Sequence, residues 1–177
     1  MALPGDFDLD GFVRSTLAED LGTDGDVTSK ATIAEDARFT AEMNCREPIV
    51  VAGIGIAEAF FRRLDPDAGI ETLVSDGDQV PKGTVLMRIS GKARAMLTAE
   101  RSALNTLQHL SGIATLTRRY VDAIAGTGAK LLDTRKTIPG LRVLEKYAAR
   151  MTILRAWGFA AAHIGAGPAL FKCSARC

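Results

Sequence analysis

The chain has 177 residues, 47% hydrophobic and 24% charged, which suffices for one packed domain and part of a second. This composition excludes a disordered or collagen-like chain. No run reaches the ~18 uncharged apolar residues of a membrane span, and the first ten residues are acidic where a signal peptide is basic. We therefore expect a cytoplasmic protein without membrane contact. The three cysteines, Cys45, Cys173 and Cys177, form no CxxC pair and are interpreted as free thiols.

The net charge of +1 hides an uneven distribution along the chain. Residues 1–36 carry nine acids and two bases, and residues 37–87 carry eight acids and five bases. Residues 88–177 carry fifteen bases and only four acids. This basic half predicts binding to anions. It has few aromatic rings, whereas proteins that bind single-stranded nucleic acid interleave bases with such rings, so the pattern favours a small anionic ligand over nucleic acid.

The first part of the chain predicts a helix followed by a small sheet. Apolar residues recur every four positions from Leu9 to Leu21, which predicts an amphipathic helix that ends at Gly22. Residues 22–31 are interpreted as a loop rich in turns. From Phe39 onward, short apolar runs broken by glycine turns at 76–78 and 81–83 predict an antiparallel sheet, with a helix over 57–64 between its strands.

A long helical pattern then runs from about residue 93 to about residue 125, with a break or bend expected at Gly112. The apolar run 129–133 has the length of a strand, and Pro139-Gly140 turns the chain into a further helix over 141–150. Strand, polar cluster, turn and helix are typical of the first βα unit of a parallel α/β architecture. In such folds, ligands bind at the carboxyl ends of the strands.

Basic residues at two places could bind an anion. Arg135 and Lys136 follow the predicted strand and suit a ligand with two acid groups, although a solvated strand end would look the same. Arg101 lies on the long helix and is either a ligand contact or a surface residue, solvated or paired with a glutamate. His109 is interpreted as a satisfied surface or interface histidine, and His163 has no partner at ligand spacing, so no metal site is expected here.

Several segments together carry a family resemblance. They are AEDLGTDGDVTSKA, REPIVVAGIGIAEAFF, DGDQVPKGTVLMRISGKAR, AERSALNTLQHLSGIATLTRRYV and LDTRKTIPGLRVLEKYAAR. From Asp8 to Arg150 the chain resembles quinolinate phosphoribosyltransferase, also called carboxylating nicotinate-nucleotide pyrophosphorylase. The resemblance implies phosphoribosyl transfer from phosphoribosyl pyrophosphate to quinolinate with decarboxylation, giving nicotinate mononucleotide, pyrophosphate and CO2 in NAD biosynthesis. It also implies a homodimer in which the N-terminal domain of one subunit completes the active site of the other.

The same resemblance implies roles for four residues. Arg101, in the A-E-R segment, would reach across the dimer to the acid groups of quinolinate. Thr134, Arg135 and Lys136, in the D-T-R-K-T segment, would bind substrate, and Lys136 would also be catalytic. Mg2+ is expected as cofactor, with its ligands in a part of the barrel beyond the matched segments. A dianionic substrate and a phosphorylated co-substrate agree with the basic charge of this half of the chain.

With the resemblance, the predicted fold class is α+β. Residues 1–114 would form an N-terminal helix-flanked antiparallel sheet domain, residues 115–150 the start of an α/β barrel, and residues 151–177 a divergent tail. A barrel takes on the order of 200 residues, and 51 follow Gly126, so we expect a truncated barrel and a chain that is inactive alone. The tail is either an out-of-frame extension or a diverged ending.

One alternative from another functional class remains. The segment DGDQVPKGTVLMRISG resembles the paired-turn hairpins of biotinyl and lipoyl carrier domains. On that interpretation the chain would be a non-catalytic carrier or a dimerisation module, and Lys82 would be the modified residue. Lys82 lies between Pro81 and Gly83, which matches poorly the hydrophobic or acidic neighbours of such lysines.

Overall fold

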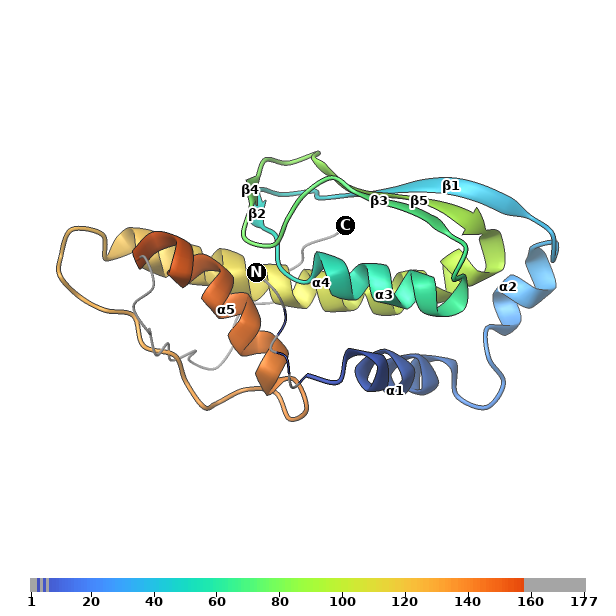
Figure 1. Ribbon diagram of the computed structural model, residues 1–177, viewed down its shortest axis with the longest axis horizontal. Coiled ribbons are helices and arrows are strands. Elements are labelled where there is room, and N and C mark those ends of the chain that lie inside the picture. The colour runs from blue at the N-terminus through green and yellow to red at the C-terminus, as the bar shows by residue number, and fades with distance from the viewer. Residues whose placement is uncertain (1–2, 4, 6, 158–177) are drawn as a thin grey trace.

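The computed structural model describes residues 3, 5 and 7–157, with side chains up to residue 153. The elements in chain order are α1 (Leu9–Leu21), α2 (Val27–Thr32), β1 (Arg38–Asn44), β2 (Ile49–Val50), α3 (Ile54–Leu64), β3 (Gly69–Thr72), β4 (Gln79–Val80), β5 (Val85–Lys92), α4 (Ala93–Ala123) and α5 (Arg142–Trp157). Figure 1 shows the strands above a layer formed by α3 and α4, with α1 below and α5 against the far end of α4.

The predicted antiparallel sheet is confirmed. Strand β5 lies between β1 and β3, and β2 pairs separately with β4. On the outer face, Arg88 of β5 lies opposite Glu42 and Glu71 and forms ion pairs of 3.0 and 3.4 Å with them. Its neighbours Met87 and Ile89 are buried in the core with α3 and α4. This alternation is the period-two pattern of a sheet with one solvated face.

The first helix matches the prediction, whereas the expected loop 22–31 contains a helix. Helix α1 ends at Gly22, whose φ of 53° is a conformation that favours glycine. The loop prediction was wrong from Val27 onward, because the carboxylate of Asp26 accepts a hydrogen bond of 2.9 Å from Ser29 N and caps the short helix α2. Helix α3 begins at Ile54, three residues before its predicted start.

The long helix is confirmed, but the break at Gly112 is not. Helix α4 runs without interruption from Ala93 to Ala123. Leu110, Ser111 and Ala114, on either side of the glycine, are buried. A glycine inside a helix costs about 1 kcal/mol relative to alanine. The burial of these flanking residues outweighs that cost, so the helix continues.

The strand predicted over 129–133 is also wrong, since this stretch is irregular. A parallel strand is held only by hydrogen bonds to a neighbouring strand, and the described residues place none beside it. The helix predicted after it is confirmed as α5 and continues past Arg150. Thr152 on that extension donates a 2.9 Å hydrogen bond to the carbonyl of Ala114, so the first residues after 150 belong to the packed fold.

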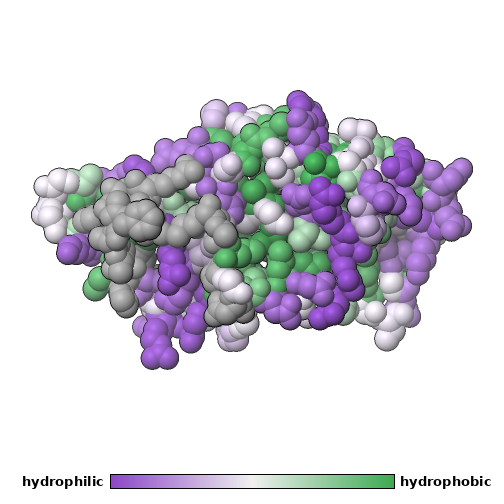
Figure 2. Space-filling model, viewed as in Figure 1, coloured by the Kyte–Doolittle hydropathy of each residue, from purple (hydrophilic) through white to green (hydrophobic). Residues whose placement is uncertain are grey.

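One hydrophobic core joins α1, the strands, α3, α4 and α5. Figure 2 shows hydrophobic residues reaching the surface in the middle of the face in view, with hydrophilic residues around them. Three alanines of α4 have no exposed surface and let neighbouring helices approach closely: Ala99, Ala103 and Ala114. From α5, Leu144 and Tyr147 enter the same core. The proposed boundary between domains 1–114 and 115–150 therefore falls within a continuous helix, and it remains a prediction.

The carboxylate of Asp76 connects three parts of the fold. One oxygen accepts hydrogen bonds of 2.9 and 3.0 Å from the backbone N–H groups of Gly53 and Ile54, which satisfies the start of α3. The other oxygen accepts a hydrogen bond from the hydroxyl of Tyr147 on α5. Burial, together with this contact to Asp76, raises the pKa of Tyr147 above its usual range. A turn before β4 thereby fixes both α3 and α5.

Replacing Tyr147 by Phe should lower the free energy of unfolding by about 1–3 kcal/mol, because it removes a hydrogen bond to a charged group. Urea denaturation measures the change. Tyr120→Phe is the matched control, since Tyr120 is 51% exposed on α4 and its variant should be near neutral. A loss for Tyr147→Phe no larger than that of the control would contradict the assigned role.

The same contact predicts a pH dependence. Because the pKa of Tyr147 is raised on folding, the folded chain keeps a proton that the unfolded chain releases above about pH 10. The contribution of Tyr147 to stability is then complete below that pH and is lost as the pH rises further. The difference in unfolding free energy between the wild type and Tyr147→Phe should shrink on going from about pH 9 to about pH 11. A constant difference over this interval would rule the linkage out.

Candidate active site

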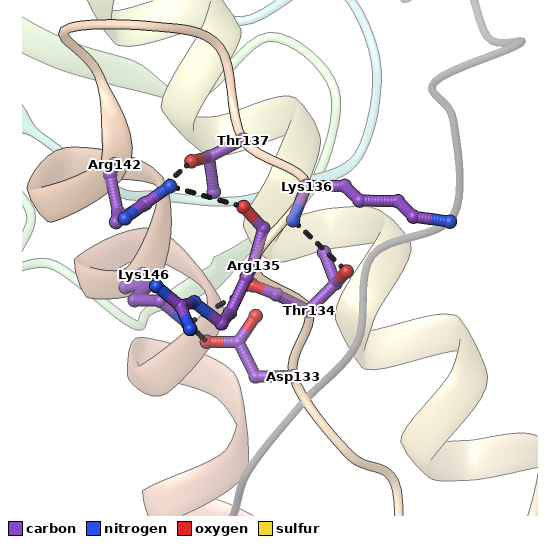
Figure 3. Close-up of polar contacts among 7 residues, drawn as sticks. All are labelled: Asp133, Thr134, Arg135, Lys136, Thr137, Arg142 and Lys146. Carbon is purple, nitrogen blue, oxygen red and sulfur yellow. Dashed lines mark hydrogen bonds and ion pairs between the residues drawn. The ribbon is translucent and has the colours of Figure 1, made fainter.

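The predicted substrate-binding residues Thr134, Arg135 and Lys136 lie together in the loop between α4 and α5 (Figure 3). The hydroxyl of Thr134 accepts a 3.1 Å hydrogen bond from the backbone N–H of Lys136, and the carbonyl of Arg135 accepts one of 3.1 Å from Thr137 N. The side chains of Arg135 and Lys136 are exposed. Within the described residues, neither makes a hydrogen bond or ion pair through its charged group. In Figure 3 the two side chains leave the turn in opposite directions, that of Arg135 toward α5 and that of Lys136 away from it.

Two basic side chains of α5 hold this turn from both sides. Lys146 Nζ lies 2.6 Å from Asp133 Oδ2 and donates a 3.1 Å hydrogen bond to the carbonyl of Thr134. Arg142 donates to the hydroxyl of Thr137 at 3.2 Å and to the carbonyl of Arg135 at 3.3 Å. Residues four apart lie on one face of a helix, so both reach the loop together (Figure 3).

Sequence reasoning missed both anchoring residues. The available signal was a pair of bases four positions apart, at the start of the helix that follows the polar cluster. Their partners in the loop are acceptors at known places: the carboxylate of Asp133, a threonine hydroxyl and two carbonyls. From the sequence, a base on the first turns of a helix is interpreted as a solvated surface residue. Only the folding of the loop brings the acceptors close to Arg142 and Lys146.

Glu145, on the same first turns of α5, ties the loop to α4. One carboxylate oxygen lies 2.9 Å from Nε2 of His109, and the other accepts a 3.3 Å hydrogen bond from the N–H of Ile138. The interpretation of His109 as a satisfied histidine agrees with this contact. The loop is therefore held by side chains at 142, 145 and 146, all of them from α5.

Arg101 lies elsewhere. Its side chain is 72% exposed and pairs at 2.9 Å with Asp20 of α1, an aspartate rather than the glutamate considered from the sequence. It lines a shallow pocket of about 190 Å³ with Asp20 and Asp26. Hydrogen bonds from Ser29, with a smaller effect of Arg101, hold the pKa of Asp26 below its usual range. Figure 1 places this end of α4 beside α1 and α2, at the opposite end from α5 and its loop, so one chain does not bring Arg101 to Arg135.

No three histidine, cysteine, aspartate or glutamate side chains gather at metal-binding distance in the part of the chain that the structure describes. These residues therefore do not fit a Mg2+ ion, and no step of the chemistry is derived through one. Among the same residues, no helix has the length and apolar character needed to cross a bilayer. Cys45, the cysteine within the described residues, is a buried free thiol.

Comparison with known proteins gives two adjacent matches to one family. Residues 26–111 match the model for the quinolinate phosphoribosyl transferase N-terminal domain, and residues 113–152 match the one for its C-terminal domain. The second match extends two residues past Arg150, where the resemblance was expected to end.

Among curated relatives, quinolinate phosphoribosyltransferase [decarboxylating] 1b of Nicotiana tabacum is 45% identical over 142 residues, covering 80% of this chain and 40% of the relative. Nicotinate-nucleotide pyrophosphorylase [carboxylating] of Mycobacterium leprae is 44% identical over 141 residues, covering 78% of this chain and 50% of the relative. The chain thus spans about half or less of the length of these relatives.

Solved structures agree. NadC from Streptococcus pyogenes superposes with a TM-score of 0.80 at 34% identity, over 86% of this chain and 54% of that protein. The nicotinate-nucleotide pyrophosphorylase from Francisella tularensis superposes with a TM-score of 0.76 at 42% identity, over 81% and 51%. The strands with α2 and α3 lie within the first match, and the loop with most of α5 lies within the second. The chain belongs to the quinolinate phosphoribosyltransferase family.

Proposed function

We propose that this chain forms the quinolinate-binding part of a quinolinate phosphoribosyltransferase, the enzyme that converts quinolinate and phosphoribosyl pyrophosphate to nicotinate mononucleotide, pyrophosphate and CO2. The observation that carries the proposal is the turn with Arg135 and Lys136, which projects two unpaired cations within the described residues and lies in a segment matched to the family. An exposed guanidinium beside an ammonium suits a ligand with more than one acid group.

The reaction needs cations more than a protein nucleophile. The ring nitrogen of quinolinate forms a bond to the first ribose carbon as the bond to pyrophosphate breaks, and the leaving group takes the electron pair. Loss of CO2 from the adjacent ring carbon leaves an electron pair there that accepts a proton. Arg135 would bind a carboxylate of quinolinate through two parallel hydrogen bonds, and Lys136 would stabilise the charge of the departing pyrophosphate. Thr134 would set the turn, since its hydroxyl already accepts from Lys136 N.

Arg101 fits this site only if it comes from a second subunit. It pairs with Asp20 at the end of α4 that lies away from the loop. With 72% of its side chain exposed, Arg101 is accessible to a neighbouring chain, and it would have to exchange Asp20 for the substrate there. A homodimer in which Arg101 of one subunit reaches the loop of the other is therefore part of the proposal.

Two further expectations stay predictions. Mg2+ would have to be held by residues other than those described here, because these do not form a cluster of ligands. The cytoplasmic location is likewise untested, and several plant relatives bear the names mitochondrial or chloroplastic.

The carrier alternative has less support. In a carrier hairpin the two strands that flank the lysine turn pair with each other. Here β4 pairs with β2, whereas β5 pairs with β1 and β3. The turn that carries Lys82 is also fastened to Cys45, whose carbonyl accepts a 2.7 Å hydrogen bond from Gly83 N. The whole segment lies inside the matched N-terminal domain.

The substrate role of Arg135 can be tested in a chimera in which residues 8–150 replace the matching part of the Francisella tularensis relative. Arg135→Lys keeps the charge but removes the bidentate geometry, so kcat/KM for quinolinate should fall by about one to two orders of magnitude. Arg119→Lys, at an exposed position of α4, is the control and should retain activity. A folded chimera that forms no nicotinate mononucleotide, or an unchanged Arg135→Lys, would contradict the proposal.

The dimer proposal has a separate test in the same chimera. Arg101→Ala and Lys136→Ala should each abolish most activity, because every active site then lacks one of its three cations. Mixing the two variants and allowing subunits to exchange should restore activity at the one site that receives both wild-type residues. If no activity returns while both variants are folded and dimeric, Arg101 does not act across subunits.

A further inference from the structure

The turn that presents Arg135 and Lys136 has little support of its own. Residues 124–141 contain no helix or strand. Fixing the backbone of one residue costs about 1–2 kcal/mol of conformational entropy, so an irregular segment keeps one shape only where other groups hold it. Upstream of Arg135, Leu131 packs against the small apolar cluster of Val121, Ala149 and Ile153. The described polar contacts between this part of the loop and another segment come from a single side chain, that of Lys146.

We propose that Lys146 is a positioning residue of this site, acting through Asp133, an inference that rests on the proposed function for its substrate. Its ammonium binds Asp133 Oδ2 at 2.6 Å and the carbonyl of Thr134 at 3.1 Å, the two residues directly before Arg135. Both side chains of the ion pair are shielded, with 26% of Lys146 and 14% of Asp133 exposed. Screening by water is weaker there than for a surface pair.

Lys146 can position the loop because its own helix is fixed. On either side of it, Glu145 contacts His109 of α4, and Tyr147 contacts Asp76 in the turn before β4. Leu144 is buried in the core. The contacts of α5 with α4 and with the turn before β4 therefore fix the position of the Lys146 ammonium. Its bonds to Asp133 and Thr134 in turn fix the loop (Figure 3).

The ion pair has a second effect, on charge. Asp133 is two residues from Arg135 and three from Lys136, so an unpaired carboxylate there would attract the cations that should bind substrate. Lys146 occupies this carboxylate and leaves Arg135 and Lys136 available to an anion. A residue that only held the loop in place would not change the charge near Arg135 and Lys136. The positioning role and the charge role of Lys146 can therefore be tested separately.

Hydrogen exchange of the full chain tests the positioning role without any need for catalysis. In Lys146→Gln, the amides of Lys136, Thr137 and Ile138, which are hydrogen-bonded in the loop, should exchange about three- to tenfold faster. Lys146→Arg should restore slow exchange, and Lys130→Gln, at an exposed position three residues before Asp133, should leave it unchanged. Asp133→Asn removes the same pair from the loop side and keeps the test decisive if Lys146→Gln does not fold. Unchanged exchange in the folded variant would overturn the proposal.

Calorimetric titration of the full chain with quinolinate tests the charge effect. Lys146→Gln should weaken binding about three- to tenfold, and adding Asp133→Asn should recover part of the affinity because the competing carboxylate is gone. A double variant that binds more weakly than Lys146→Gln would overturn the charge role. If the wild-type chain does not bind quinolinate, the substrate assignment fails, whereas the exchange experiment still decides whether Lys146 positions the loop.

Discussion

The burial of one long helix is the constraint on which this fold depends. Helix α4 packs against α1, α3, the strands and α5, and three of its alanines, Ala99, Ala103 and Ala114, have no exposed surface. Close packing at such positions leaves little room for larger side chains. The same burial explains why Gly112 does not interrupt the helix. Since α4 spans both family-matched regions, the sheet and the loop with α5 are held to one common element.

A series of polar contacts connects the core to the candidate site. Asp76 caps α3 and accepts from Tyr147, which fixes α5. The next residue toward the loop, Lys146, then holds Asp133, and the cations project from the turn that follows. Each contact is short-ranged, so a change at Asp76 reaches Arg135 only by moving α5. The effects of substitutions at Asp76 and at Arg135 should therefore be coupled through α5.

The uneven charge of the sequence also takes on a structural meaning. Several bases of the second half already have partners within the chain, since Arg88, Arg142 and Lys146 all bind acceptors from other segments. Among the described residues, Arg135 and Lys136 are neighbouring bases whose charged groups are exposed and unpaired, so two positive charges of this half remain close together for a ligand. An anion-binding site is thus defined as much by which cations are already paired as by how many the chain contains.

The sequence by itself determined the period-two strands, the helices α1, α4 and α5, and the segments that carry the family resemblance, because periodicity and turn residues are local. It also placed Thr134, Arg135 and Lys136 in one cluster. Only the tertiary structure decided that α4 continues without a break at Gly112 and that residues 129–133 form no strand, since burial and strand pairing depend on distant neighbours. It alone showed that Arg101 pairs with Asp20 and that Lys146 holds Asp133. Contacts between segments far apart in the chain produce no recognisable spacing pattern in the sequence. They become visible only once packing has brought these segments together.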